Sequence, residues 1–187
     1  MPRPRVSVYL GVSVDLLIAR EDGRLDWLER FHDPAGGDYG YAAFFSTIDT
    51  LVIGRATYDT VLGFDRWPWE GKRVVVFSHR PIAPRPGVEQ AEGALAPALE
   101  ALFALGARHV YLDGGALVRQ GLREAVVDAL TLSIVPHLLG SGRPLFERGG
   151  PELGLRLLGA EAFPSGLVQL RYERSEVGSP GAGGEAR

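Results

Sequence analysis

Three segments of the sequence combine glycine with arginine or a hydroxyl group directly after an apolar run. The first, Gly54-Arg55-Ala56-Thr57, follows the apolar run 50–53 and opens a helical pattern. An arginine and a hydroxyl group beside free backbone N–H groups suit the oxygens of a phosphate. The same residues also suit a tight strand-to-helix turn with a solvated arginine, so this segment alone leaves both interpretations open.

The other two segments extend the pattern. Ser78-His79-Arg80 follows the run 73–77, and it suits either a phosphate monoester, such as the 2′-phosphate that distinguishes NADP from NAD, or an exposed loop. Gly114-Gly115-Ala116-Leu117 follows the run 109–112, where paired glycines let the backbone approach a diphosphate or simply end a strand. Together the three segments predict one phosphate-binding edge, provided that they lie on one sheet.

Asp15 is the acidic residue whose surroundings are most unusual. It lies within the apolar segment 11–19, just after the first β-type run. A carboxylate there must be exposed at the strand end, paired, or held in a pocket at a raised pKa, and the last environment would suit proton transfer. All three environments remain open on position alone.

Short β-type runs alternate with helical patterns along the chain, and this order indicates how the segments are positioned. Strand–helix–strand units make parallel, right-handed crossovers. The sequence therefore predicts a three-layer α/β/α domain over residues 1–176, with a mixed, mostly parallel sheet, a C-terminal antiparallel hairpin and a flexible tail at 177–187. The predicted strands are 6–10, 50–53, 73–77, 109–112 and 129–135, the helices 39–48, 55–62, 97–105 and 116–124, and the hairpin strands 153–163 and 167–173.

Composition excludes several classes of function. The 187 residues carry a net charge of −3, which gives no support for a nucleic-acid partner. Cysteine is absent and the four histidines are scattered, so no metal site is expected.

Arg3, Arg5 and the apolar stretch 6–19 superficially resemble a signal peptide, but Asp15 and the charged residues 20–22 argue against secretion and predict a cytoplasmic protein without membrane contact. The usual glycine-rich dinucleotide and P-loop fingerprints do not occur.

A set of motifs in family order resembles the dihydrofolate-reductase-like reductases. In particular it resembles stand-alone relatives of the reductase domain of the bifunctional riboflavin-pathway deaminase/reductase. The motifs span nearly the whole chain before the tail. They are Val12-Ser13-Val14-Asp15, Gly23-Arg24-Leu25-Asp26-Trp27-Leu28, Ile53-Gly54-Arg55-Ala56-Thr57-Tyr58, Ser78-His79-Arg80-Pro81, Gly114-Gly115, Ile134-Val135-Pro136-His137-Leu138-Leu139-Gly140, Arg143-Pro144-Leu145-Phe146 and Ser165-Gly166-Leu167-Val168-Gln169-Leu170.

The resemblance implies a dihydrofolate-reductase-like fold, a homodimer and NADPH-dependent hydride transfer to a pteridine- or pyrimidine-like heterocycle, often phosphoribosylated, as in 5-amino-6-(5-phosphoribosylamino)uracil reductases. It also assigns roles to individual residues. The nicotinamide would be bordered by Gly11 and Ile18, and phosphate and ribose would be held by Gly54, Arg55 and Thr57. The adenosine end would be bound by Ser78, His79 and Arg80, and the diphosphate by Gly114, Gly115, Ala116 and Leu117. The substrate pocket would be faced or shaped by Ser13, Asp15, Leu139 and Gly140. Asp15 is then the candidate that supplies or orients the proton.

The chain departs from the family pattern at one place. Ser13-Val14-Asp15-Leu16-Leu17 stands where the family commonly has Ser-Leu-Asp-Gly followed by an aromatic residue or arginine. The missing glycine removes easy access to positive φ in the loop that the resemblance places beside the nicotinamide, and the two leucines make that wall more apolar. The two leucines also motivate an alternative function, a non-catalytic NADPH-binding protein. A plain interaction domain that uses Trp27, Trp67 and Trp69 is a third hypothesis.

Overall fold

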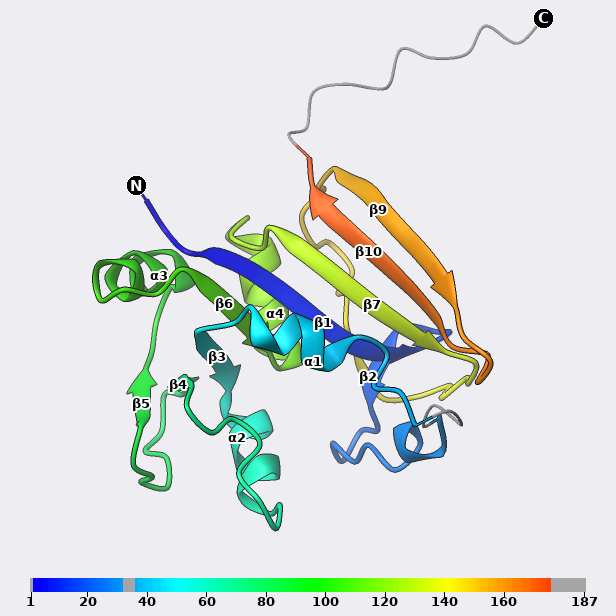
Figure 1. The fold of residues 1–187 in the computed structure, drawn as a ribbon, viewed down its shortest axis with the longest axis horizontal. Coiled ribbons are helices and arrows are strands. Elements are labelled where there is room, and N and C mark those ends of the chain that lie inside the picture. Colours follow the sequence, from blue (N-terminus) through cyan, green and yellow to red (C-terminus); the bar gives the residue numbers. More distant parts are fainter. Residues whose placement is uncertain (1, 32–35, 176–187) are drawn as a thin grey trace, which may run out of the picture.

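The computed structural model describes residues 2–31 and 36–175, which fold around one eight-stranded sheet (Figure 1). The strand order in space is β5-β4-β3-β6-β1-β7-β10-β9, and β2 pairs with β8 in a small second sheet. The tail predicted at 177–187 lies outside the described residues. The strands are β1 (Arg5–Ser13), β2 (Leu17–Ala19), β3 (Thr50–Gly54), β4 (Arg73–Phe77), β5 (Val88–Ala91), β6 (His109–Asp113), β7 (Ala129–Val135), β8 (Arg143–Pro144), β9 (Leu155–Ala162) and β10 (Val168–Arg174).

The first six strands of this order run parallel, and the last two form the antiparallel hairpin. β1 lies in the centre between β6 and β7, and β10 pairs antiparallel with both β7 and β9. The carboxyl ends of β3, β4 and β6 therefore meet at one edge of the sheet. This mixed, mostly parallel topology confirms the predicted fold class.

Helices cover both faces of the parallel part of the sheet, so the three predicted layers are present. Aromatic and aliphatic side chains of α1 (Tyr41–Ser46) and α2 (Arg55–Leu62) pack on one face, with β3, β4 and Tyr111. Leucines of α3 (Leu95–Ala104) and α4 (Gly115–Arg123) pack on the other face in the larger core. A short 3-10 helix, η1 (Leu28–Phe31), adjoins a third cluster around Trp27. None of the helices in 2–31 and 36–175 is long and apolar enough to cross a bilayer.

Two helices begin two residues away from the predicted start. The prediction that Pro97 is the first residue of its helix is wrong, because α3 begins at Leu95, whose N–H and that of Ala96 donate to the carboxylate of Glu124. The predicted helix 39–48 is shorter at both ends. It begins at Tyr41 because Tyr39 and Gly40 have positive φ, and Asp38 accepts the N–H groups of Gly40 and Ala42.

Candidate functional site

The first and third glycine segments are in contact at the carboxyl edge of the sheet. β3 and β6 are neighbours, and each leads directly into a helix, α2 and α4. A Cβ atom built on Gly114 would lie 2.9 Å from Thr57 Oγ1 and 3.2 Å from the backbone N of Gly54. Gly114 has φ 97°, a conformation that side chains rarely adopt. Only glycine fits this position, because both the backbone angle and the neighbouring segment exclude a side chain.

The second segment joins the same cluster through Arg55. Arg55 Nη1 donates to the carbonyl oxygen of Pro81 at 2.9 Å, which links the start of α2 to the loop after β4. Within that loop the buried hydroxyl of Ser78 donates to the carbonyl of Arg80 at 2.6 Å, so it shapes the turn. The side chains of His79 and Arg80 are exposed, and Arg80 makes no ion pair with any residue that the structure describes.

Two helix N-termini therefore lie side by side at this edge. The N–H groups of residues 55–57 and 115–117 have no acceptor within their helices, because each is in the first turn. Such groups, together with the positive ends of two helix dipoles, favour anionic phosphate oxygens. Leu117 is buried in the core, so it can contribute only its backbone, whereas Ala116 is exposed.

Ile18 and Gly115 connect the phosphate-binding edge with the first strand. A Cβ atom on Gly115 would lie 2.1 Å from Ile18 Cδ1, so the isoleucine packs directly against the glycine. Gly11, earlier on β1, has Leu28 Cδ2 only 3.1 Å from its Cβ position. Of the two residues predicted to border the nicotinamide, Ile18 thus contacts the start of α4, and Gly11 lies beside η1.

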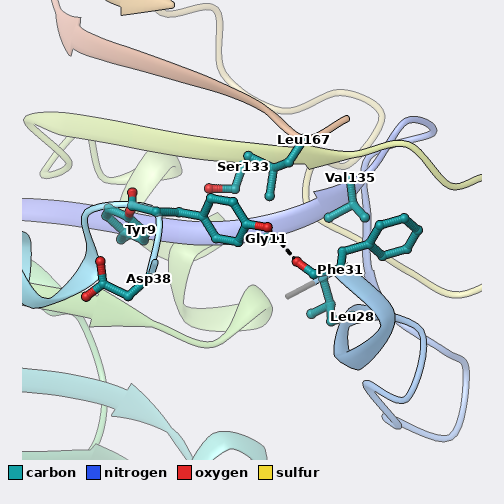
Figure 2. A pocket seen from close by; sticks show the side chains of 9 residues that line it. Tyr9, Gly11, Leu28, Phe31, Asp38, Ser133, Val135 and Leu167 are labelled. Atoms are coloured by element: carbon teal, nitrogen blue, oxygen red, sulfur yellow. Dashed lines mark hydrogen bonds between the residues drawn. The ribbon is translucent and has the colours of Figure 1, made fainter. Parts of the chain in front are cut away.

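A cavity of about 210 Å³ opens beside Gly11 (Figure 2). Figure 2 shows Tyr9 and Gly11 from β1, Ser133 and Val135 from β7, and Leu28 and Phe31 from η1 around it. Asp38, Tyr39 and Leu167 complete the lining. A second cavity of about 370 Å³ shares Tyr9 and Tyr39 and extends over β7 and β10. An aromatic and aliphatic lining with a few polar groups suits a flat heterocycle.

A hydrogen-bonded group fixes the wall between the two cavities. Gln169 is buried, and its amide donates to the hydroxyl of Tyr9 at 2.8 Å, to the carbonyl of Tyr39 at 3.0 Å and to Ser133 Oγ at 3.2 Å. The Tyr9 hydroxyl donates to the same Tyr39 carbonyl at 2.5 Å. Burial raises the pKa of Tyr9, so its hydroxyl remains a neutral donor. The resemblance assigned no role to Tyr9, Tyr39 or Ser133.

Asp15 is exposed, and its carboxylate is held by the backbone. It accepts the N–H of Leu139 at 3.1 Å and that of Gly140 at 2.8 Å. A hydrogen bond with Ser13 is the main cause that lowers the pKa of Asp15, and these two backbone donors add to it. A carboxyl group with a lowered pKa stays ionised near neutral pH and has no proton to supply. The geometry therefore gives Asp15 a positioning role for the 139–140 turn, and its predicted role, to supply or orient the proton, stays a prediction.

The predicted substrate residues are placed around that turn and outside the cavity lining. Ser13 is fully buried, and its hydroxyl accepts the N–H of Leu17 at 2.9 Å, so it closes the turn that follows β1. Ser13 is not among the residues that line the two cavities, and its predicted contact with the substrate stays a prediction. Leu139 packs behind the cavity against the Trp27 cluster, while Gly140 is exposed with φ 74°.

The departure at Leu16 leaves the loop in the conformation that glycine would adopt. Leu16 has φ 58°, so the loop reaches a left-handed conformation at this residue although no glycine is present. The N–H of Leu16 donates to Ser13 and its carbonyl accepts the N–H of Leu145, and these bonds at 2.9 Å hold the turn against the strain. A leucine in this region costs about 1–2 kcal/mol.

We expect Leu16→Gly to keep or raise the free energy of unfolding, by up to about 1 kcal/mol, because relief of the strain offsets the added chain entropy. Urea denaturation checks this. Leu17→Gly is the matched control, since Leu17 belongs to β2 and has no positive φ, and it should lose about 1 kcal/mol or more. Equal losses in the two variants would contradict the strain argument.

Asp113 is a candidate functional residue that sequence reasoning missed. It ends β6, directly before Gly114, and it is half-buried. Burial raises the pKa of Asp113 to about 6, against the opposing effect of the Gly114 N–H, which lies 2.7 Å from Oδ1. Its charge contributes to the raised pKa values of Tyr41 and Tyr111, after burial. The sequence signal that could have identified Asp113 is its position at the end of a predicted strand, directly before two glycines.

Comparison with known proteins agrees with this arrangement. A model of the family described as RibD C-terminal domain matches residues 4–169. The chain belongs to the RibD C-terminal domain family. The uncharacterized protein YwjB of Bacillus subtilis (strain 168) is a further relative, 36% identical over 175 residues that cover 91% of this chain and 98% of YwjB. These matches confirm the resemblance that the sequence motifs predicted.

Solved structures show the same fold for the RibD C-terminal domain family. A putative riboflavin biosynthesis protein from Shewanella sp. PV-4 is 33% identical, with a TM-score of 0.85 over 92% of this chain and 99% of that one. Acinetobacter baumannii RibD is 18% identical, with a TM-score of 0.72 over 93% of this chain and 59% of that one. This chain therefore shares its fold with a part of the Acinetobacter baumannii RibD chain.

Proposed function

We propose that this chain is an NADPH-dependent reductase that transfers a hydride to a pteridine- or pyrimidine-like heterocycle. The observation that carries the proposal is the contact of three distant segments, through Gly114 against Thr57 and Arg55 against Pro81, beside an aromatic cavity. Membership of the RibD C-terminal domain family supports it.

The residues present fit a dinucleotide phosphate. Gly114 and Gly115 let the start of α4 lie close to Thr57 and Ile18, and the free N–H groups of the first turn of α4 would bind the diphosphate. The first turn of α2, with Arg55 and Thr57, would hold a second set of phosphate oxygens. Arg80, exposed beyond β4, would bind the 2′-phosphate that NADH lacks. Gly11 and Ile18 would border the nicotinamide.

The chemistry requires a hydride and a proton at two neighbouring atoms of a C=N or C=O bond. NADPH, when bound, supplies the hydride. In this proposal Asp113 supplies the proton in place of Asp15, because its pKa of about 6 leaves roughly a tenth of it protonated at neutral pH and ready for general acid catalysis. Tyr9 and Gln169 orient the heterocycle by fixing the cavity wall.

Two measurements test the function. Fluorescence titration should show saturable NADPH binding, and nicotinamide absorbance should show NADPH oxidation with at least one compound of a panel of dihydropteridines and aminouracils. Saturable binding with no oxidation across the panel would favour the non-catalytic NADPH-binding alternative. Absence of NADPH binding would overturn the proposal.

Arg80→Ala should discriminate between the two nicotinamide cofactors. We expect NADPH affinity to fall tenfold or more, since a charge-assisted hydrogen bond contributes about 1.5–3 kcal/mol, and NADH affinity to change by less than about twofold. Arg156→Ala is the control, because Arg156 lies on β9 at the opposite end of the sheet. Equal loss for NADPH and NADH would show that Arg80 does not contact the 2′-phosphate.

A further inference from the structure

The second cavity, of about 370 Å³, lies on the same face of the sheet as the first cavity, which is the one beside Gly11. Thr131 lines the second cavity, Ser133 lines the first, and the two are alternate residues of β7. Alternate residues of a strand lie about 7 Å apart on one face. Tyr9 and Tyr39 line both cavities. One ligand can therefore occupy both, with a ring in the first cavity and a substituent of that ring in the second.

The lining of the second cavity combines aromatic rings with hydrogen-bonding groups. Tyr39, Phe44 and Phe163 supply aromatic surface, and Thr131 supplies a hydroxyl group. Gln169 is 2% exposed, and its amide nitrogen Nε2 makes three hydrogen bonds. Its amide oxygen Oε1 accepts no hydrogen bond from the part of the chain that the structure describes. An amide oxygen that lines a cavity without a donor favours a ligand that brings one, such as a hydroxyl group.

Of the described residues that line the two cavities, three are charged, and two of these are acidic. Asp38 lines the first cavity, and Glu161 and Arg171 line the second. Hydrogen bonds from backbone N–H groups lower the pKa of Asp38, so it is ionised at neutral pH. Arg171 Nη1 lies 3.4 Å from Glu161 Oε2, so the guanidinium is already paired. Burial is the main cause that raises the pKa of Tyr9, and the three charges also act on it, which agrees with their position around this shared wall.

We propose that the second cavity binds an uncharged, hydroxylated substituent of the heterocycle, such as a sugar or polyol chain, and disfavours the phosphate ester of that substituent. The proposal rests on the proposed function, because it names the substrate class of the same site. Hydroxyl groups can donate to the carboxylate of Glu161 and to Oε1 of Gln169, and they can accept from Arg171. An aromatic lining with a few polar groups suits such a chain.

A phosphate ester would meet an unfavourable balance of charge in the second cavity. A phosphate monoester carries about 1.5 to 2 negative charges at neutral pH. It would face the paired guanidinium of Arg171, the carboxylate of Glu161 and, in the neighbouring cavity, that of Asp38. Like charges within a few ångströms repel, and the repulsion is larger beside a protein wall than in bulk water.

The groups that would bind the phosphates of NADPH lie at another part of the sheet. Arg55, Arg80 and the first turns of α2 and α4 follow β3, β4 and β6. The second cavity lies over β7 and β10, and β1 separates these strands from β6. The fold thus places basic side chains and helix N-termini at the cofactor end and leaves the second cavity with a net negative lining.

Isothermal titration calorimetry of the full chain with two matched pairs of ligands tests the proposal. The pairs are neopterin with neopterin monophosphate, and 5-amino-6-ribosylaminouracil with its 5′-phosphate. In each pair that binds, we expect the unphosphorylated compound to bind at least about fivefold more tightly. A phosphate ester that binds as tightly as its unphosphorylated partner, or more tightly, would overturn the proposal. Failure of both unphosphorylated compounds to bind would overturn it as well.

Glu161→Gln tests whether charge is the cause of the preference. The variant removes one negative charge and leaves Arg171 unpaired, so the preference for the unphosphorylated compound should shrink about fivefold. Glu89→Gln is the matched control, because Glu89 lies on the other edge strand, β5, and pairs with Arg73 at 2.7 Å. It should keep the preference of the wild type. A preference that is unchanged in Glu161→Gln would contradict the electrostatic basis of the proposal.

Oxidation of NADPH with the same four compounds separates this proposal from the proposed function. If the unphosphorylated compounds bind more tightly but none of the four is reduced, the proposed function fails and the assignment of the second cavity stands. If NADPH is oxidised with a higher kcat/KM for the phosphate esters, the assignment of the second cavity fails and the proposed function stands.

Discussion

Replacing Asp113 by asparagine is expected to lower the rate of reduction about 100-fold or more while it stabilises the fold. The carboxyl group is the only part of the side chain that can release a proton, and loss of a general acid typically costs 10²–10⁴-fold. NADPH affinity should stay the same or rise, because the change removes a negative charge beside Gly114 and Gly115. Steady-state rates and NADPH titrations on the same preparation separate these two effects.

The effect on stability follows from the raised pKa of Asp113. The folded pKa is about 6 and the ordinary value is 3.8, so the folded state binds the proton more tightly than the unfolded state. Ionisation therefore costs folding free energy above pH 6, and the cost disappears as the pH falls from 6 towards 4. At neutral pH it amounts to about 3 kcal/mol at most, and Asp113→Asn should recover about 1–3 kcal/mol of it.

Urea denaturation at pH 7 and pH 5 checks the sign. The contribution of Asp113 should make the wild type more stable at pH 5 than at pH 7, and Asp113→Asn should lack this gain. The rate of the wild type should decline as the pH rises through the pKa of Asp113 in the complex. Asp65→Asn is the control for a carboxyl group on the exposed surface, and it should change neither property. An unchanged rate in Asp113→Asn would remove Asp113 from the mechanism.

Gly114→Ala is expected to have the second largest effect, on both NADPH affinity and stability. The new Cβ atom would lie 2.9 Å from Thr57 Oγ1 and 3.2 Å from the backbone N of Gly54, and φ would remain 97° unless the segment moves. We expect a loss of about 2–3 kcal/mol in the free energy of unfolding. NADPH affinity should fall tenfold or more, because the same movement displaces the N–H groups at the start of α4.

Two further variants test whether the contact between residue 114 and Thr57 causes these losses of stability and NADPH affinity. Gly149→Ala is matched in backbone, with φ 72°, but no atom lies within 4 Å of its Cβ position. It should lose about 1–2 kcal/mol and leave NADPH affinity unchanged. Thr57→Ala removes the nearest colliding atom, so the double variant with Gly114→Ala should lose less stability than the two single losses combined, by about 1 kcal/mol. Additive losses would show that Gly114 and Thr57 do not interact.

The sequence predicted the parallel part of the fold because its elements carry local signals. β4 and β7 have the predicted bounds, and so does α2, since each is a run of apolar or helix-forming residues between glycine, proline or charged residues. β5 (Val88–Ala91) was missed. It is a short edge strand with two polar residues, and only its pairing with β4 makes it a strand.

The candidate site was likewise predicted only in part. Glycines with arginine and hydroxyl groups after apolar runs were sufficient to predict a common phosphate-binding edge, because the carboxyl ends of parallel strands meet. The roles of the acidic residues were not predictable. The pKa of Asp15 depends first on its hydrogen bond with Ser13 and then on the distant Leu139–Gly140 turn, and the pKa of Asp113 depends on how far the fold buries the end of β6.

The sequence by itself thus determined the family, the order of the elements and the glycine positions at the phosphate-binding edge, all of which are encoded over a few consecutive residues. Only the tertiary structure decided which carboxyl group has a raised pKa, that Leu16 has a left-handed conformation and that leucines of the hairpin are exposed. The reason is that burial, strain and exposure are set by contacts between segments far apart in the chain, and a single sequence does not state those contacts.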